Sequence, residues 1–157
     1  MPSYNMQTAY PATFPKGIHG QIASEEKYNA VSFSVQTAAG LKFGAPAGRG
    51  TVDKTCVLYA DGGDFVGLAV LDPTPEFPQP GAADIVDGFP QHATAALMTE
   101  GSMYGRTNAA VTAGGAVFFD AASNSYGTAG LEIPGAIYDT SAAANGIVEI
   151  SLGHRVA

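Results

Sequence analysis

Apolar and polar side chains alternate one by one along residues 30–37, AVSFSVQT. Val31, Phe33 and Val35 fall on one side of an extended chain, while serine and glutamine fall on the other. Successive side chains of a β-strand point to opposite faces, so this period of two predicts a strand with one buried face. No segment of ten residues shows a convincing helical period.

Short apolar runs of the same kind recur along the chain. Strands are predicted at residues 20–23, 40–50, 55–60, 65–72, 92–101, 116–120, 130–140 and 147–154. The run 65–72 is apolar on both faces and is expected to be central, and the strand at 130–140 is expected to bend at Pro134 and Gly135. Polar or glycine-rich stretches predict turns at 24–29 and 61–64 and an exposed loop at 121–130. About eight to ten short strands predict an all-β fold, a compact antiparallel β-barrel or sandwich.

Prolines mark two further segments. Residues 1–18 contain three prolines and are predicted to form an extended N-terminal arm. Residues 73–90 contain five prolines, which cannot sit inside a sheet, so this stretch is predicted to be a long loop. The remaining chain, 19–157, is expected to be a single β domain that carries this loop.

The two proline-containing segments carry large aromatic side chains. Aromatic anchors are common energetic centres of interfaces, and an arm of this kind cannot bury them by folding on itself. The arm is therefore predicted to lie along a neighbouring subunit. The candidate interface residues are Tyr4, Tyr10, Phe14, Phe77 and Phe89.

Composition narrows the range of partners. Only 13% of the 157 residues are charged, which suits a surface that is partly covered by other proteins. The net charge is −7 and the seven basic residues are scattered, so no nucleic-acid partner is expected. No apolar stretch approaches the length of a membrane span, and no membrane partner or secretory leader is expected; synthesis is predicted in the cytoplasm.

No residue pattern indicates catalysis, a cofactor or a metal site. His19, His92 and His154 are far apart and lack neighbouring ligands, and the spacing of Asp61 and Asp64 is not that of a calcium loop. Residues 101–105, GSMYG, do not match the G-x-S-x-G nucleophile motif. The chain is therefore not expected to be an enzyme or to hold a cofactor.

The alternation also predicts the core. Cys56 lies in an apolar run and is expected to be a buried, inert thiol. The side chains expected to be largely buried are Phe33, Val35, Phe65, Val66, Leu68, Val117, Phe119, Ile137, Val148 and Ile150.

Several short motifs, taken in order along the chain, resemble the structural cement proteins of tailed bacteriophages. They include GQIA, an A-G-x-x-F-G strand end, FVGLA and a closing IPGA followed by a Ser/Ala-rich turn. The resemblance covers about residues 17–152, and only the loop 73–90 matches poorly. The matching stretches are 17–50, 65–70, 96–101, 110–120 and 133–152.

This resemblance implies a decoration protein of the phage virion. Its partner would be the major capsid protein, whose neighbouring copies it would bridge on the outer surface of the assembled head. A homo-oligomer is expected, with a trimer favoured over a dimer on the geometry of capsid junctions. An alternative from the residues alone is a small β-barrel module that binds a ligand or carbohydrate, although the absence of Trp counts against sugar stacking.

Overall fold

The fold is built entirely from strands in the part of the chain that the structure describes. The computed structural model describes residues 17–73 and 87–153. The strands are β1 (Ile22–Val35), β2 (Leu41–Lys42), β3 (Pro46–Arg49), β4 (Thr55–Leu58), β5 (Phe65–Ala69), β6 (Gly88–Phe89), β7 (Thr94–Arg106), β8 (Ala116–Asp120), β9 (Ser125–Gly127), β10 (Leu131–Tyr138) and β11 (Ile147–Leu152). None of these residues forms a helix that is long and apolar enough to cross a membrane. The all-β prediction is confirmed.

One large mixed sheet contains most of the strands. Its order is β1-β4-β3-β5-β7-β11-β10-β8-β9, and β2 pairs with β6 in a separate two-stranded sheet. The pairing of β1 with β4 is parallel, with Ser34 opposite Thr55. The expectation of purely antiparallel pairing is therefore wrong at this position, since β1 and β4 run in the same direction.

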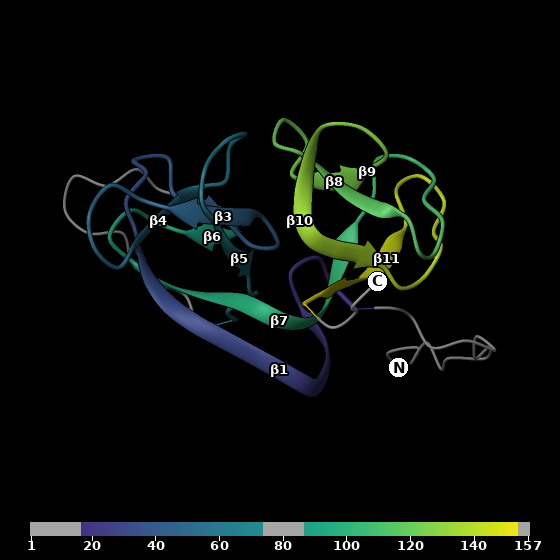
Figure 1. The fold of residues 1–157 in the computed structure, drawn as a ribbon, viewed down its shortest axis with the longest axis horizontal. Helices are drawn as coiled ribbons and strands as arrows, with labels where there is room; N and C mark the ends of the chain where they lie inside the picture. Colours follow the sequence, from purple (N-terminus) through teal and green to yellow (C-terminus); the bar gives the residue numbers. More distant parts are fainter. Residues whose placement is uncertain (1–16, 74–86, 154–157) are drawn as a thin grey trace, which may run out of the picture.

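The strand β7 is shared by two lobes (Figure 1). In the first lobe, pairing passes from β1 through β4, β3 and β5 to β7, which pairs again with β1. In the second lobe, pairing passes from β7 through β11, β10 and β8 to β9. A bridge between Thr107 and Tyr126 then connects β9 to the residue that follows β7. The strand β5 pairs with residues 97–98 of this 13-residue strand and β11 pairs with residues 101–106, so β7 joins the two lobes.

Most of the predicted core is confirmed, with three corrections. Phe65 and Val66 are only half-buried, because they stand at the start of β5 directly after an exposed turn. Ile137 is also half-buried. The seven confirmed core residues are Phe33, Val35, Leu68, Val117, Phe119, Val148 and Ile150.

A bulge in β10 explains the error at Ile137. The pairing of β10 with β8 shifts register between Glu132 and Ile137, and Gly135 has a φ of 71°. Five residue steps along β10, from 132 to 137, face only two along β8, from 118 to 116. This odd difference changes the side of the sheet to which the following side chains point. The buried positions therefore pass from Ile133 to Ala136 and Tyr138, which leaves Ile137 partly outside.

Three predicted turns or loops contain strand residues. The loop predicted at 73–90 ends in β6, whose two residues pair with β2. Residues 24–29, expected as a turn, lie within β1, where residues 25–28 bulge outward opposite Gly101. Within 121–130, expected as an exposed loop, the strand β9 is fully buried and Tyr126 has no exposed surface. A lone aromatic among small polar residues gave no alternation from which β9 could be predicted.

Candidate interaction surface

The structure places the five predicted interface aromatics in two groups. Tyr4, Tyr10, Phe14 and Phe77 lie outside the described residues. Phe89 lies in β6, opposite Leu41 of β2, and only 1% of it is exposed. Its ring meets that of Phe43 edge-on, with 5.0 Å between the centroids. Phe89 therefore belongs to the core rather than to the surface, and it is dropped as an interface residue.

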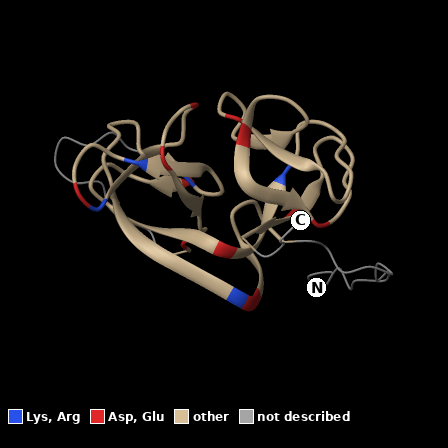
Figure 2. Cartoon of the chain, in the orientation of Figure 1, with Lys and Arg blue, Asp and Glu red and all other residues tan. Residues whose placement is uncertain are grey.

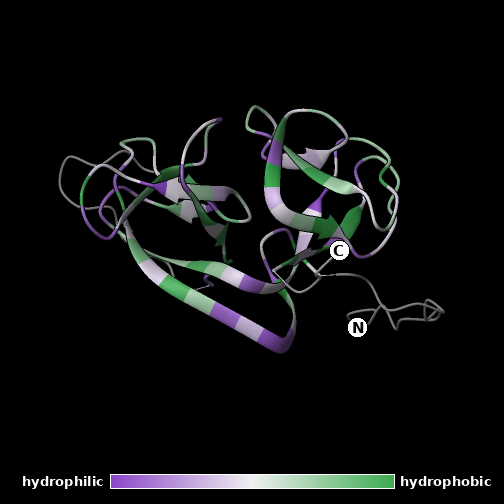
Figure 3. Ribbon diagram, in the orientation of Figure 1, coloured by the Kyte–Doolittle hydropathy of each residue, from purple (hydrophilic) through white to green (hydrophobic). Residues whose placement is uncertain are grey.

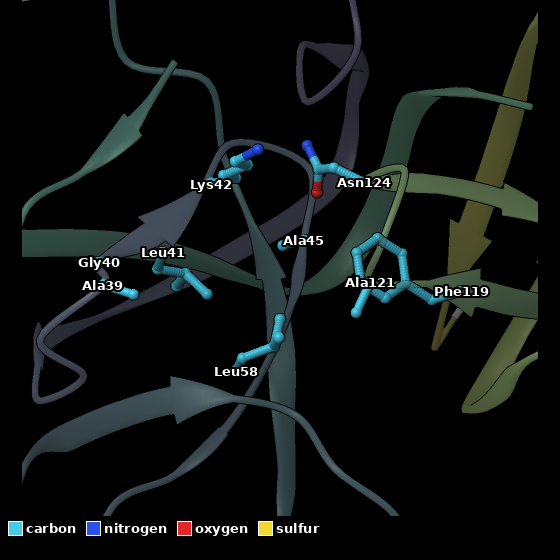
Figure 4. Close-up of a pocket in the computed structure, with 9 residues that line it drawn as sticks. All are labelled: Ala39, Gly40, Leu41, Lys42, Ala45, Leu58, Phe119, Ala121 and Asn124. Atoms are coloured by element: carbon cyan, nitrogen blue, oxygen red, sulfur yellow. The ribbon is translucent and has the colours of Figure 1, made fainter. Parts of the chain in front are cut away.

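An apolar pocket opens between the two lobes (Figure 4). It has a volume of about 200 Å³. The first lobe contributes residues 39–42, Ala45 and Leu58, and the second contributes Phe119, Ala121 and Asn124. We call this set of residues the inter-lobe pocket. Because Leu58 of β4 keeps 37% of its surface exposed, the rim of the pocket offers an apolar contact to another molecule.

Hydrogen bonds across the seam fix the shape of the inter-lobe pocket. The Asn124 side-chain amide donates to the carbonyl of Phe43 at 3.3 Å. The Tyr126 hydroxyl donates to the carbonyl of Gly44, and this hydroxyl is buried. Both donors come from the second lobe and both acceptors from the loop between β2 and β3. The two walls of the pocket are therefore held in one arrangement before any partner binds.

The turn that carries Ala121 and Asn124 is held by Asp120. The Asp120 carboxylate accepts hydrogen bonds from the Ser123 hydroxyl at 2.8 Å and from the Ala122 N–H at 3.0 Å. These bonds, with the Ser123 bond the largest cause, lower the pKa of Asp120. An ionised carboxylate at this position keeps the turn, and with it one wall of the pocket, in place.

His19 lies in an adjoining pocket of about 250 Å³, which also has Asn124 in its wall. Its Nδ1 accepts a hydrogen bond from the Arg106 backbone N–H at 2.9 Å. Nε2 is buried and has no hydrogen-bond partner among the described residues. Burial, together with the charge of Arg106, lowers the pKa of His19 to about 4. The imidazole is therefore neutral near pH 7 and connects the N-terminal turn to the end of β7.

Charged groups are sparse on the ribbon (Figure 2). Lys42 is exposed at the rim of the inter-lobe pocket. Arg106 and Asp87 line the adjoining pocket. The surface therefore combines an apolar floor with a few polar groups at its edge, which is the arrangement found at protein interfaces.

The described residues contain no group of three or more His, Cys, Asp or Glu side chains that could hold a metal ion. Cys56 is fully buried, and burial raises the pKa of its thiol to about 11. A protonated, inaccessible thiol is a poor nucleophile, which agrees with the prediction of an inert cysteine.

The alternation of apolar and polar residues does not indicate that His19, Asn124 and Tyr126 lie near one another. His19 and Arg106 are 87 positions apart, and Phe43 and Asn124 are 81 positions apart. An alternation of period two relates only residues within one strand, so it carries no information on contacts between residues this far apart. Asn124 carried one local signal, because asparagine tolerates the positive φ of 47° that it adopts in a tight turn.

Comparison with known proteins gives a consistent result. The model of the family "Structural cement protein (E217 gp24/Pam3 gp6)" matches residues 6–153. A chain in the solved structure described as "The capsid of Myoviridae Phage XM1" has a similar fold, with a TM-score of 0.63 and 13% sequence identity. The similarity covers 97% of this chain and 99% of that chain. No curated protein matches the sequence.

The family match spans nearly the whole chain, including the residues that form both lobes. It confirms the resemblance that the short motifs had indicated. The chain belongs to the phage structural cement protein family, and its role is that of a capsid cement protein in the virion.

Proposed function

We propose that this protein, made in the host cytoplasm, binds the outer surface of the assembled phage head and bridges neighbouring major capsid proteins. A ligand that binds only the assembled lattice stabilises that lattice by its binding free energy. Many modest contacts are sufficient when each copy touches several subunits, because the linked contacts act together. The proposal rests on the family match, which covers residues 6–153.

The inter-lobe pocket is our candidate for the capsid contact. Its volume of about 200 Å³ suits one large apolar side chain from the capsid protein. The hydrogen bonds of Asn124 and Tyr126 preorganise the site, which lowers the entropic cost of binding. The exposed Leu58 at its rim is the single observation that carries this assignment.

Substitution of Leu58 tests the contact. Leu58→Asp places a charge at the rim and is expected to weaken binding to cement-free heads at least tenfold. Val52→Asp is the matched control, because Val52 is 60% exposed and does not line the pocket. It should change the affinity less than twofold, and both variants should melt within a few degrees of the wild type. Equal affinity of both variants for cement-free heads would show that the inter-lobe pocket is not part of the interface.

The position on the outside of the head has a separate test. Cryo-electron microscopy of heads before and after addition of the protein should show new density outside the shell. Unassembled capsid protein should bind weakly, because it lacks the junction between subunits. Density inside the shell, or equal affinity for free capsid protein, would contradict the proposal.

We further infer a homo-oligomer, with a trimer favoured over a dimer. A trimer fits capsid junctions with three-fold symmetry, where each copy meets an equivalent environment. Light scattering of the free protein should then give three times the 16.0 kDa of one chain. The aromatics Tyr4, Tyr10, Phe14 and Phe77 remain candidates for contacts with a neighbouring subunit. A monomer at high concentration would count against a preformed oligomer.

The first lobe is proposed to be a small closed β-barrel. Five pairings, from β1 through β4, β3, β5 and β7 back to β1, support this reading. Val35, Ala47, Cys56, Leu68 and Leu97, one from each strand, have no exposed surface. Closure leaves few open edges in this lobe, which suits a rigid platform for the contact loops.

A further inference from the structure

We propose that the outer edge of β1 accepts residues 3–10 of a second copy of this chain as an additional strand. This inference deepens the proposed homo-oligomer and depends on it. The contact between the two copies is an intermolecular β-ladder on the open side of β1.

Backbone hydrogen bonds define that open side. The Val35 N–H donates to Ala93 just before β7, at 2.9 Å, and the Ser34 N–H donates to Lys54 just before β4, at 2.9 Å. Successive residues of a strand direct their backbone groups to opposite sides. Ala30 and Ser32 therefore direct theirs to the same side as Ser34, away from β7.

No described strand pairs with that side of β1 before Ser34, where the ladder with β4 begins. In Figure 1, β1 runs along the border of the molecule with β7 on one side of it. Unpaired N–H and C=O groups on a strand edge are a template for pairing with another chain.

Side chains along β1 divide this edge into a blocked part and an open part. Residues 25–28 bulge out and carry Glu25, Glu26 and Lys27, a combination that discourages pairing. Residues 30–33 have neither charge nor proline. Figure 3 shows the same change along β1, from hydrophilic at its bend to more hydrophobic further on. The open part is therefore the place at which an added strand would fit.

The sequence of residues 3–10, SYNMQTAY, supplies a matching strand. Tyr4, Met6 and Tyr10 fall on one face of an extended chain, and Ser3, Asn5, Gln7 and Ala9 on the other. The segment contains no proline, although Pro2 and Pro11 flank it directly. Eight residues in a strand span about 26 Å, more than the open part of β1 requires.

The position of Gly17 favours a second copy over the same chain. Gly17 lies against the ring of Tyr104 in β7. The near end of the open part of β1, at Ala30, is opposite Met98, about 20 Å from Tyr104 along β7 and about 10 Å across it. The seven Cα steps between Tyr10 and Gly17 span at most about 25 Å. An arm would therefore reach the edge of its own β1 only when close to full extension, whereas an arm from another copy has no such limit.

Disulfide trapping between two differently tagged full-length chains tests the ladder. One chain carries Ser32→Cys, and the other carries a single cysteine at one position from 4 to 9. Ser32 is exposed on the face of β1 opposite to the buried Phe33. Cysteines at 5, 7 and 9 should therefore give at least fivefold more inter-chain cross-link than cysteines at 4, 6 and 8, because only one face of an added strand can meet Ser32. The wild type, with only the buried Cys56, is the control for background.

Each alternative result overturns the inference. Equal yields at all positions would mean proximity without a β-ladder, and cross-links only within one chain would place the arm on its own edge. Absence of cross-links in a protein that still forms its oligomer would place the arm elsewhere. Binding to heads is measured in parallel with the uncross-linked proteins. If binding persists without the ladder, only this inference fails, whereas loss of head binding by the wild type would contradict the proposed function itself.

Discussion

The two lobes bury their largest side chains in different ways. Near the first lobe, the large side chains that are fully buried include Leu41, Leu68 and Leu97, whereas in the second lobe they include Tyr126 and Tyr138. A buried aliphatic side chain needs only to be excluded from water, but a buried phenol must also find a partner for its O–H. The stability of the first lobe should therefore depend on packed volume, and that of the second on hydrogen-bond geometry as well.

The tyrosine hydroxyls of the second lobe have such partners. Tyr138 donates to the carbonyl of Gly127 at 2.7 Å, and Tyr126 donates across the seam to Gly44. Burial raises the pKa of Tyr138 to about 12 and raises that of Tyr126 further. Both phenols thus stay protonated and remain donors throughout the range in which the protein is handled.

The largest expected effect is a loss of packed volume in the first lobe. Phe33 is 6% exposed, with Lys54 Nζ 5.2 Å from its ring centroid. Phe33→Ala should lower the free energy of unfolding by about 3–5 kcal/mol, measured by urea denaturation. Val52→Ala, at an exposed position, should cost less than about 0.5 kcal/mol. A loss below 1 kcal/mol for Phe33→Ala would contradict the view that the packing of buried side chains stabilises the first lobe.

The next effect concerns pH at the seam between the lobes. The pKa of His19 falls from 6.5 to about 4 in the folded protein, so the unfolded chain binds the extra proton more readily. The stabilisation is fully present above pH 6.5 and is lost as the pH falls toward 4. The loss at this site should reach about 3 kcal/mol, seen as a fall in the free energy of unfolding.

His19→Asn isolates this contribution. Asparagine offers an oxygen that can accept the Arg106 N–H, but it does not titrate between pH 4 and 7. The variant should therefore show a smaller dependence of stability on pH across this window than the wild type. Identical slopes would show that His19 is not the group responsible.

The smallest effects are expected from substitutions that remove a buried tyrosine hydroxyl but keep the ring. They test whether hydrogen bonds contribute to the stability of the second lobe. Tyr126→Phe and Tyr138→Phe should each cost about 1–2 kcal/mol, because each leaves a carbonyl without its donor. Tyr126 and Asn124 bond to neighbouring carbonyls across the seam, so their substitutions should be non-additive. In a double mutant that combines Asn124→Gly with Tyr138→Phe, the two losses in the free energy of unfolding should instead be additive. The coupling energies are obtained from unfolding curves of the single and double mutants. Equal coupling of both tyrosines to Asn124 would contradict the proposed difference between a hydroxyl at the seam and one inside the second lobe.

The strands with strong alternation were predictable from the sequence. The buried positions of β11, at Val148, Ile150 and Leu152, follow the expected face, and the alternation at 30–37 locates the end of β1. Buried and exposed side chains alternate as predicted wherever a strand has one buried face and no bulge. At Pro134 and Gly135 the bend was expected, but the change of side that it imposes on Ile137 was not.

Features made by residues far apart in the sequence were not predictable. Phe89 follows a run of prolines and was assigned to the surface, but its pairing with Leu41 carries it into the core. The inter-lobe pocket joins residues near 40 and 58 with residues near 120. Only the three-dimensional pairing of strands brings such segments together, and no local pattern encodes it.

The sharing of β7 between the lobes has a mechanical consequence. A force that pulls the lobes apart acts along the covalent backbone of this 13-residue strand and not only on contacts at the seam. Separation would require β7 to slide out of its ladder with β5 or with β11, which breaks several hydrogen bonds at once. A cement protein that bridges capsid subunits in the proposed way would therefore resist stretching as one body, because its two lobes share a continuous strand.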